Sequence, residues 1–226
     1  MATARDVGKV LATFPQKAIP TAGSMLKRLV DAAVDGVDPL PGARVSAGRY
    51  LERRVEVDLA IESLVNQHIA MASAQGFVTN IGGLLTAIVT APANITGVVV
   101  VQIRMVACIA HLRGYDINDD RVRTAMLMCM LGEEELTEAI ASGALPTTPL
   151  AVATAPVFDA ELDQRVCERV VGALLTNMGG KHLTALVARR IPLVGGGVGA
   201  AFDGYSTHRI GVCARKHLVS RRRLTR

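Results

Sequence analysis

The sequence predicts an all-α protein, a multi-helix bundle with a central apolar helical hairpin and a glycine-rich C-terminal helix. Three observations lead to this class. Half of the 226 residues are hydrophobic, which excludes disorder for most of the chain. Apolar residues recur at helical spacing, and no run alternates convincingly with period two, so we expect essentially no β-sheet. Capping residues, glycines and prolines divide the chain into segments of helical length.

The N-terminal third is expected to contain three helices. A short basic amphipathic helix should cover 5–18, and a second, capped by Thr21, should end at Gly36. Two prolines in 37–43 predict a loop there. A long helix should follow from Ser46 to Gln75, with its charged residues mostly off one apolar stripe.

The apolar hairpin is predicted from a stretch without charge. No charged residue occurs in the 35 positions from Ile69 to Ile103. We expect one helix over 77–90, a turn at Ala91-Pro92, and a second helix from Asn94 to Arg113, ended by Gly114. The first arm is short for a bilayer span, which favours a hairpin buried in the core over one inserted in a membrane, but both need the same residues.

The remaining segments follow from their caps and breakers. Asp119-Asp120 should begin a helix that Gly132 stops, and a short acidic helix should follow. A Pro/Thr/Ala loop over 143–158 is the best linker candidate. The last helices are expected over 159–178, 181–190 and the glycine-rich segment after 191. There, Gly195 and Gly199 share one face and should let another helix approach closely.

Charge is distributed unevenly. The net charge is +5, but residues 61–160 carry −5 and residues 161–226 carry +8. Such a basic C-terminus suits an anionic membrane surface, while a nucleic-acid backbone is a less favoured partner, and a solvated tail is the plain alternative. The tail candidates for membrane electrostatics are Arg215, Lys216, Arg221, Arg222, Arg223 and Arg226.

The sequence gives little support to catalysis. With seven aromatic residues and no Trp, it offers no stacking platform for bases or sugars. Neither a phosphate-binding loop nor GxSxG is present, and the chain contains no HExxH or CxxC. We therefore expect no catalytic residue, no cofactor and no metal site. The start of the chain has no long apolar core of a secretory signal, so we expect a cytoplasmic protein with peripheral association at the inner face of the cell membrane.

Arg104 is the most informative polar residue of the hairpin. It stands between Ile103 and Met105 and shares a helix face with His111. A buried arginine needs a paired acid, for which Asp116, Asp119, Asp120 and Glu133–Glu135 are the candidates. The alternative is that Arg104 anchors a lipid phosphate or another anionic head group, with His111 and Lys181 as further candidate ligand-binding residues.

Several short motifs follow one another in an order that resembles the EcsC family. They are Gly76-Phe77, Gly82-Gly83, Pro92, Arg104-Met105, Gly114-Tyr115-Asp116, Gly180-Lys181 and the stretch from Ile191 to Phe202. Asn94 departs from the pattern, which has an acidic residue there. The resemblance implies one all-helical domain over 1–226. It consists of an amphipathic extension (1–45), a family-like core (61–219) and a basic tail (220–226).

The family is named for its association with an ABC transporter operon, and the resemblance implies a cytoplasmic or membrane-associated protein but no catalytic residues. We therefore favour a non-enzymatic protein that binds anionic lipid or a membrane protein at the cytoplasmic membrane face. A soluble enzyme or small-molecule binder, with a pocket near Arg104 and His111, is the second hypothesis. A self-associating structural protein, forming a homo-oligomer through glycine faces, is the third.

Overall fold

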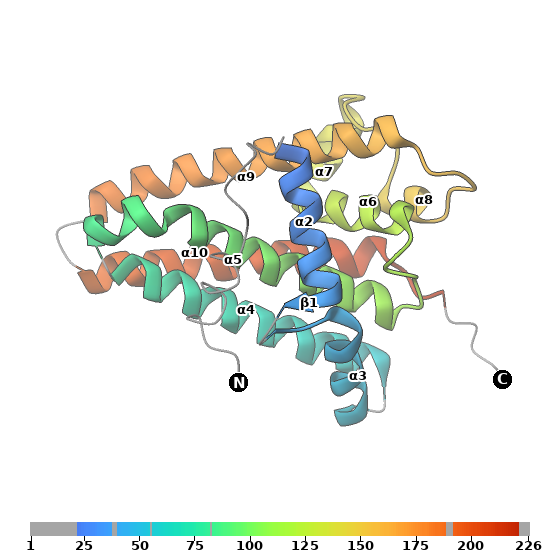
Figure 1. Cartoon of the computed structure of the whole chain (residues 1–226), viewed down its shortest axis with the longest axis horizontal. Coiled ribbons are helices and arrows are strands. Elements are labelled where there is room, and N and C mark those ends of the chain that lie inside the picture. Colours follow the sequence, from blue (N-terminus) through green and yellow to red (C-terminus); the bar gives the residue numbers. More distant parts are fainter. Residues whose placement is uncertain (1–21, 38–39, 55, 82, 189–191, 222–226) are drawn as a thin grey trace.

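A computed structural model of the chain describes residues 22–37, 40–54, 56–81, 83–188 and 192–221. For residues 22, 37, 77–81, 83–96, 177–188 and 192–196 it describes the backbone alone. Nine helices in these ranges pack together with almost no strand, which confirms the predicted all-α multi-helix bundle (Figure 1).

The helices differ greatly in length. They are α2 (Ala22–Asp35), α3 (Ala43–Arg53), α4 (Val57–Ile81), α5 (Gly83–Leu112), α6 (Asp120–Cys129), α7 (Gly132–Ala141), α8 (Pro149–Ala153), α9 (Ala160–Ala188) and α10 (Pro192–His217). Two strands of two residues each, β1 (Gly36–Val37) and β2 (Leu40–Pro41), form an antiparallel pair.

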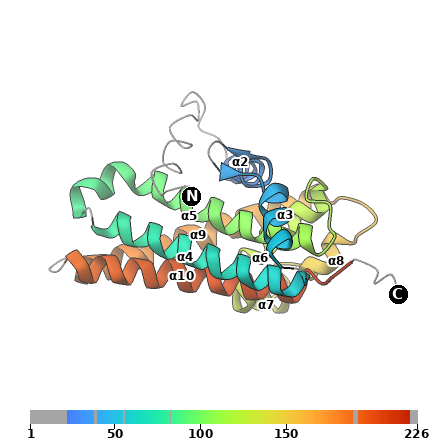
Figure 2. The same cartoon turned by 90° about the horizontal axis from the view of Figure 1, so that it is seen from below.

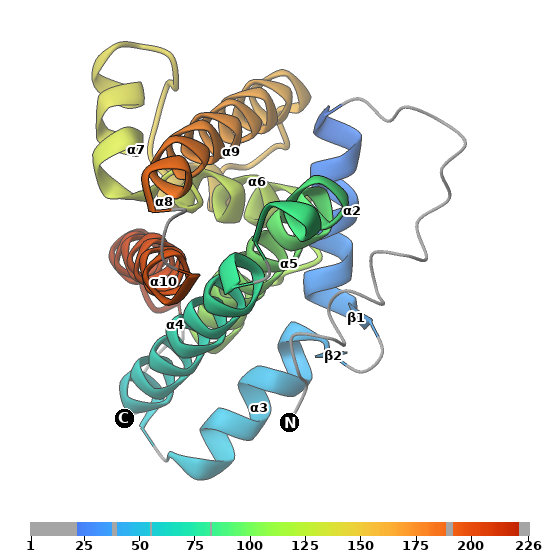
Figure 3. The same cartoon turned by 90° about the vertical axis from the view of Figure 1, so that its left-hand side faces the viewer.

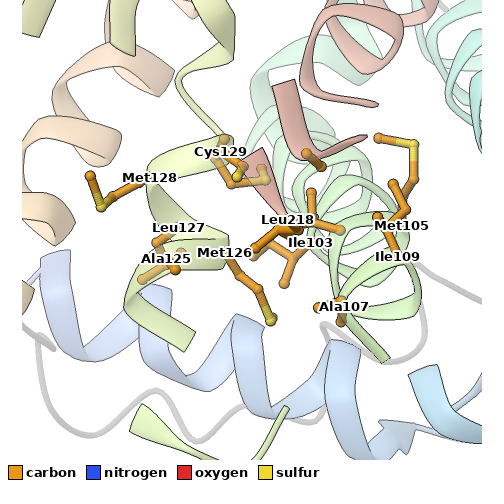
Figure 4. Packing of buried hydrophobic residues seen from close by; sticks show 14 of the residues in the cluster. Ile103, Met105, Ala107, Ile109, Ala125, Met126, Leu127, Met128, Cys129 and Leu218 are labelled. Atoms are coloured by element: carbon orange, nitrogen blue, oxygen red, sulfur yellow. The ribbon is translucent and has the colours of Figure 1, made fainter. Parts of the chain in front are cut away.

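Helix α5 is the centre of the core. Its residues from Gly97 to Ala110 are all buried, and α2, α3, α4, α6 and α10 all contact this helix. Viewed along the long axis of the molecule, these helices surround α5 (Figure 3). Figure 4 shows the core where α5, α6 and Leu218 contribute side chains, among them Ile103, Ile109 and Met126. The second arm of the predicted hairpin is therefore core from Gly97 onward.

Helices α4 and α10 approach each other closely through glycines, as the small-residue spacing predicts. A Cβ at Gly76 would lie 2.6 Å from the backbone oxygen of Gly199. A Cβ at Gly204 would overlap the hydroxyl of Ser73. Between these helices and α5, the side chain of Gln102 donates to the hydroxyl oxygens of Ser206 and Thr207 at 3.3 and 3.2 Å.

The hairpin turn lies earlier than predicted. Helix α5 continues through Ala91 and Pro92, and only residue 82 separates it from α4, so the predicted turn is wrong. Proline removes one backbone hydrogen bond, and the packing of α5 against α4 outweighs this local loss. The α4–α5 junction and the α9–α10 junction lie at the same end of the molecule (Figures 1 and 2).

Three other boundaries differ from the predictions. The helix expected over 46–75 is divided by the extended residue Arg54, because α3 packs on α5 while α4 turns away to run along α10. Helix α9 runs through Gly179-Gly180 instead of stopping there. The linker candidate contains α8, whose Thr148 hydroxyl accepts from the Ala151 N–H.

Several predicted end signals are confirmed. Asp119 caps α6 by accepting from the Arg121 N–H, and Asp159 accepts from the N–H of Leu162 at the start of α9. Gly114 ends α5 with a φ of +89°, a conformation that favours glycine. The expected helix over 5–18 and the Thr21 cap lie outside the described residues. Within the described residues, no helix combines the length and hydropathy that a bilayer crossing requires.

The glycine contact between α4 and α10 predicts a contrast between two helix-interior glycines. Gly76→Ala should lower the free energy of unfolding by about 1–3 kcal/mol, since the added methyl meets backbone atoms that cannot move aside. Gly48→Ala in α3, where a Cβ meets nothing within 4 Å, should raise it by about 0.5–1 kcal/mol. Urea denaturation of both variants measures this, and equal effects would contradict the close approach.

Candidate anion-binding site

The interior position of α5 places Arg104 between α3, α4 and α5. Its side chain is 9% exposed, and one terminal nitrogen donates to the hydroxyl oxygen of Ser46 on α3 at 2.5 Å. Ser46 in turn donates to the carbonyl of Pro41 at 3.3 Å, so the β2–α3 corner holds this hydroxyl in place. The guanidinium is thus fixed by neutral oxygen, not by a carboxylate.

The acids proposed as partners of Arg104 are engaged elsewhere or form no described ion pair with it. Asp116 pairs with Arg44, Asp119 with Arg121, Glu133 with Lys216, Glu134 with Arg209 and Glu135 with Arg169. No carboxylate among the described residues forms an ion pair with Arg104, so the expected buried salt bridge is absent from that part of the chain.

Burial makes the charge of Arg104 costly. Desolvation lowers the pKa of its guanidinium. The nearby Cys108 and Tyr50 have the opposite, smaller effect and raise this pKa. The Nε N–H also has no hydrogen-bond partner among the described residues. A buried charge without a counter-charge costs several kcal/mol. Burial of Arg104 therefore lowers the stability of the fold, and its Nε N–H stays available to donate a hydrogen bond to a ligand.

His68 supplies a buried acceptor in the same region. It is 1% exposed, and its Nδ1–H donates to the carbonyl of Leu64 at 2.8 Å. Its Nε2 has no partner among the described residues. Desolvation lowers the pKa of His68 to about 4, and the charge of Arg104 adds to this. The ring is therefore neutral near pH 7, with a free lone pair on Nε2.

Two more groups of this region are protonated and neutral. The Cys108 thiol donates to the carbonyl of Ala43 at 3.3 Å, and burial raises its pKa to about 12. The Tyr50 hydroxyl donates to the side-chain oxygen of Gln67 at 2.6 Å, and burial raises its pKa as well. A thiol with such a pKa is not a nucleophile near pH 7, so these groups suit binding and not covalent chemistry.

A second cation lies close to Arg104. The exposed Arg49 of α3 is near enough for its charge to lower the pKa of Arg104. Two like charges repel each other, and an anion beside them removes this repulsion. Together, Arg104, Arg49, Ser46 and His68 define what we call the Arg104 site. It offers charged donors, a hydroxyl and one neutral acceptor.

Of the other predicted ligand residues, His111 is not brought to this site. His111 lies in the last turn of α5, about 10 Å further along the helix axis. The side chain of Lys181 lies outside the described residues, although its backbone belongs to α9. Of the residues of the Arg104 site, the sequence predicted only Arg104. It did not predict Ser46, His68 or Arg49. The sequence did carry a signal for His68: it lies four residues after Leu64, on the same buried face of the helix.

The first residues of the predicted basic tail pack against the helical bundle. Lys216 pairs with Glu133 at 2.5 Å. Arg221 lies over the ring of Tyr115 at 5.7 Å and donates its backbone N–H to the carbonyl of Arg113. Arg215 is exposed. The remaining predicted tail residues lie outside the described part of the chain: Arg222, Arg223 and Arg226.

The fold and the site together define the class of protein: a helical bundle with a buried arginine that forms no ion pair within the described residues. No family model, curated protein or solved structure matches this chain. The resemblance to the EcsC family therefore stays a prediction.

The neutral state of His68 predicts an acid sensitivity. Its folded pKa of about 4 lies below the ordinary 6.5, so the unfolded chain takes up the proton first as the pH falls. The free energy of unfolding should thus fall between pH 6.5 and 4, by about 3 kcal/mol from this group. His68→Gln should flatten this slope in urea titrations, whereas the exposed control His208→Gln should keep it. A slope unchanged by His68→Gln would contradict a buried neutral ring.

Proposed function

We propose that this chain is a non-enzymatic helical protein that binds an anionic ligand at Arg104. The observation that supports this is a guanidinium that is 9% exposed, is held by Ser46 and forms no ion pair within the described residues. A bound anion supplies the missing counter-charge, and Arg49 adds a second positive charge beside it. The proposal agrees with the head-group interpretation of Arg104 from the sequence.

The ligand chemistry follows from the donors. A planar guanidinium binds carboxylate and phosphate through two parallel hydrogen bonds, and such bonds are strong where water is excluded. The neutral Nε2 of His68 accepts a hydrogen bond and so favours a ligand that also carries a hydroxyl or a protonated oxygen. A phosphate ester or a hydroxy acid meets both requirements, as a free metabolite or as a lipid head group.

Removal of the charge should separate ligand binding from folding. Without ligand, Arg104→Met should leave the free energy of unfolding equal or higher, because an uncompensated buried cation is lost. Inorganic phosphate should stabilise the wild type, by about 2.7 kcal/mol at a concentration of 100 times Kd, and should have no such effect on Arg104→Met. Thermal and urea unfolding across a phosphate series measures both effects.

Arg44→Met is the matched control, since Arg44 lies on α3 and its exposed ion pair with Asp116 is already satisfied. It should respond to phosphate as the wild type does. An equal response in Arg104→Met would contradict the site. A soluble phosphate ester and vesicles of equal parts phosphatidylcholine and phosphatidylglycerol, used as separate arms, distinguish a free ligand from a lipid head group.

Membrane-face binding is a second candidate, favoured by the arrangement of the hairpins. The α4–α5 and α9–α10 junctions lie at one end of the molecule (Figure 2). The uncharged run from 69 to 103 includes the first junction, and residues 169–202, which include the second, contain basic residues but no acid. Such a combination of apolar and cationic sequence suits an anionic lipid surface. We propose that this end, not the basic tail, faces the membrane.

Vesicle flotation with charge variants tests this orientation. Val89→Asp, within the uncharged run, should abolish flotation with the vesicles above, because an acid at an anionic apolar surface is repelled and costly to desolvate. Val157→Asp is the control at a 74% exposed position between α8 and α9. It should float like the wild type. Flotation that survives Val89→Asp but is lost when residues 222–226 are deleted would assign the contact to the tail instead.

A further inference from the structure

A group of metal-ligating side chains lies away from the Arg104 site, where the start of α7 meets the last turns of α10. Donor atoms of Glu133, Cys213 and His217 all lie within 4.8 Å of one another. His217 Nε2 and Glu133 Oε2 lie 3.1 Å apart. The thiol of Cys129, at the end of α6, is buried within hydrogen-bond reach of the Cys213 thiol.

The sequence separates these four residues, and the fold brings them together. Cys213 and His217 are four apart on α10 and therefore share a face. Gly132, with a φ of +76°, turns the chain sharply between α6 and α7, so that Glu133 follows Cys129 by only four residues on another helix. Ion pairs of Arg209 with Glu134 and of Lys216 with Glu133 fix α7 against α10.

From this geometry we propose a Zn²⁺ site with Glu133, Cys213 and His217 as ligands and the neighbouring thiol of Cys129 as the fourth. Thiolate, imidazole and carboxylate are the ligands that zinc takes in tetrahedral sites, with ligand atoms about 3.3–3.8 Å apart. The donor atoms of Glu133, Cys213 and His217 already lie within 4.8 Å of one another and need only small shifts to reach this spacing, while the thiol of Cys129 would have to turn toward the ion. Zn²⁺ would replace the proton on Nε2 that His217 shares with Glu133, and its uptake would release one proton from each thiol.

Charge and burial fit a structural zinc. Two thiolates and one carboxylate around Zn²⁺ leave one negative charge, which the ammonium of Lys216 beside Glu133 balances. Both cysteines are fully buried, while Glu133 and His217 are 30% and 15% exposed, so the ion enters from their side. Four protein ligands leave no open position for a substrate, so the ion would tie α6, α7 and α10 together.

Metal titration of the full-length, reduced and chelator-treated protein tests the proposal. Zn²⁺ should bind with one equivalent and raise Tm, and Co²⁺ should give the charge-transfer absorption of thiolate ligands. Cys213→Ser and His217→Gln should each weaken binding by more than about 100-fold, since even loss of an outer partner costs about 10–100-fold. The matched controls are Cys167→Ser, a buried cysteine on α9, and His208→Gln, an exposed histidine on α10. Both should bind like the wild type.

If a cysteine variant does not fold, His217→Gln still tests the proposal, because His217 is partly exposed and its substitution should not disturb the core. Its unfolding in chelator should equal that of the wild type. Metal binding that is unchanged in His217→Gln, or no uptake by the reduced wild type, would overturn the proposal. Uptake that survives Cys129→Ser would overturn the four-ligand assignment. The proposal would also be overturned if the reduced protein binds no metal and a Cys129–Cys213 disulfide forms again in air. The two cysteines would then be a redox-active pair.

Discussion

The burial of α5 on all sides is the constraint on which the rest of the structure depends. From Gly97 to Ala110 no residue of this helix reaches the surface, so its neighbours must cover every face. Five helices of different orientation, α2, α3, α4, α6 and α10, satisfy this requirement, and the order of the chain around the core follows from it. Any polar side chain on this stretch must find its partners inside the protein, because water is excluded there.

Two polar residues of α5 meet this demand in opposite ways. Gln102 finds neutral partners in Ser206 and Thr207, and the contact fixes α10 against the core. Arg104 finds the neutral Ser46 but forms no ion pair within the described residues. Hydrogen bonds to neutral groups satisfy an amide, whereas a guanidinium also needs a counter-charge. This difference is the physical basis of the proposed anion site.

The chemistry of the molecule is divided between the two ends of α10, about 39 Å apart for 26 residues. At its beginning, the two helical hairpins meet, in sequence that is apolar or basic. At its end lie the ion pairs of α7 and the cluster of Cys129, Glu133, Cys213 and His217. The hairpin end and the cluster near the end of α10 are therefore two separate places on the molecule.

Local signals in the sequence determined the helical class and several helix ends. Asp119, Asp159 and Gly114 act within one turn of the backbone, and their effects do not depend on the rest of the chain. The break at Arg54, the passage of α5 through Pro92 and the course of α9 through Gly179-Gly180 are decided by tertiary packing, which outweighs local preferences of about 1–3 kcal/mol. The sequence marked Arg104 as unusual. Only the tertiary structure could show that none of the acids proposed for it pairs with it among the described residues, and that Glu133 converges with Cys213 and His217, because such contacts join residues far apart in the chain.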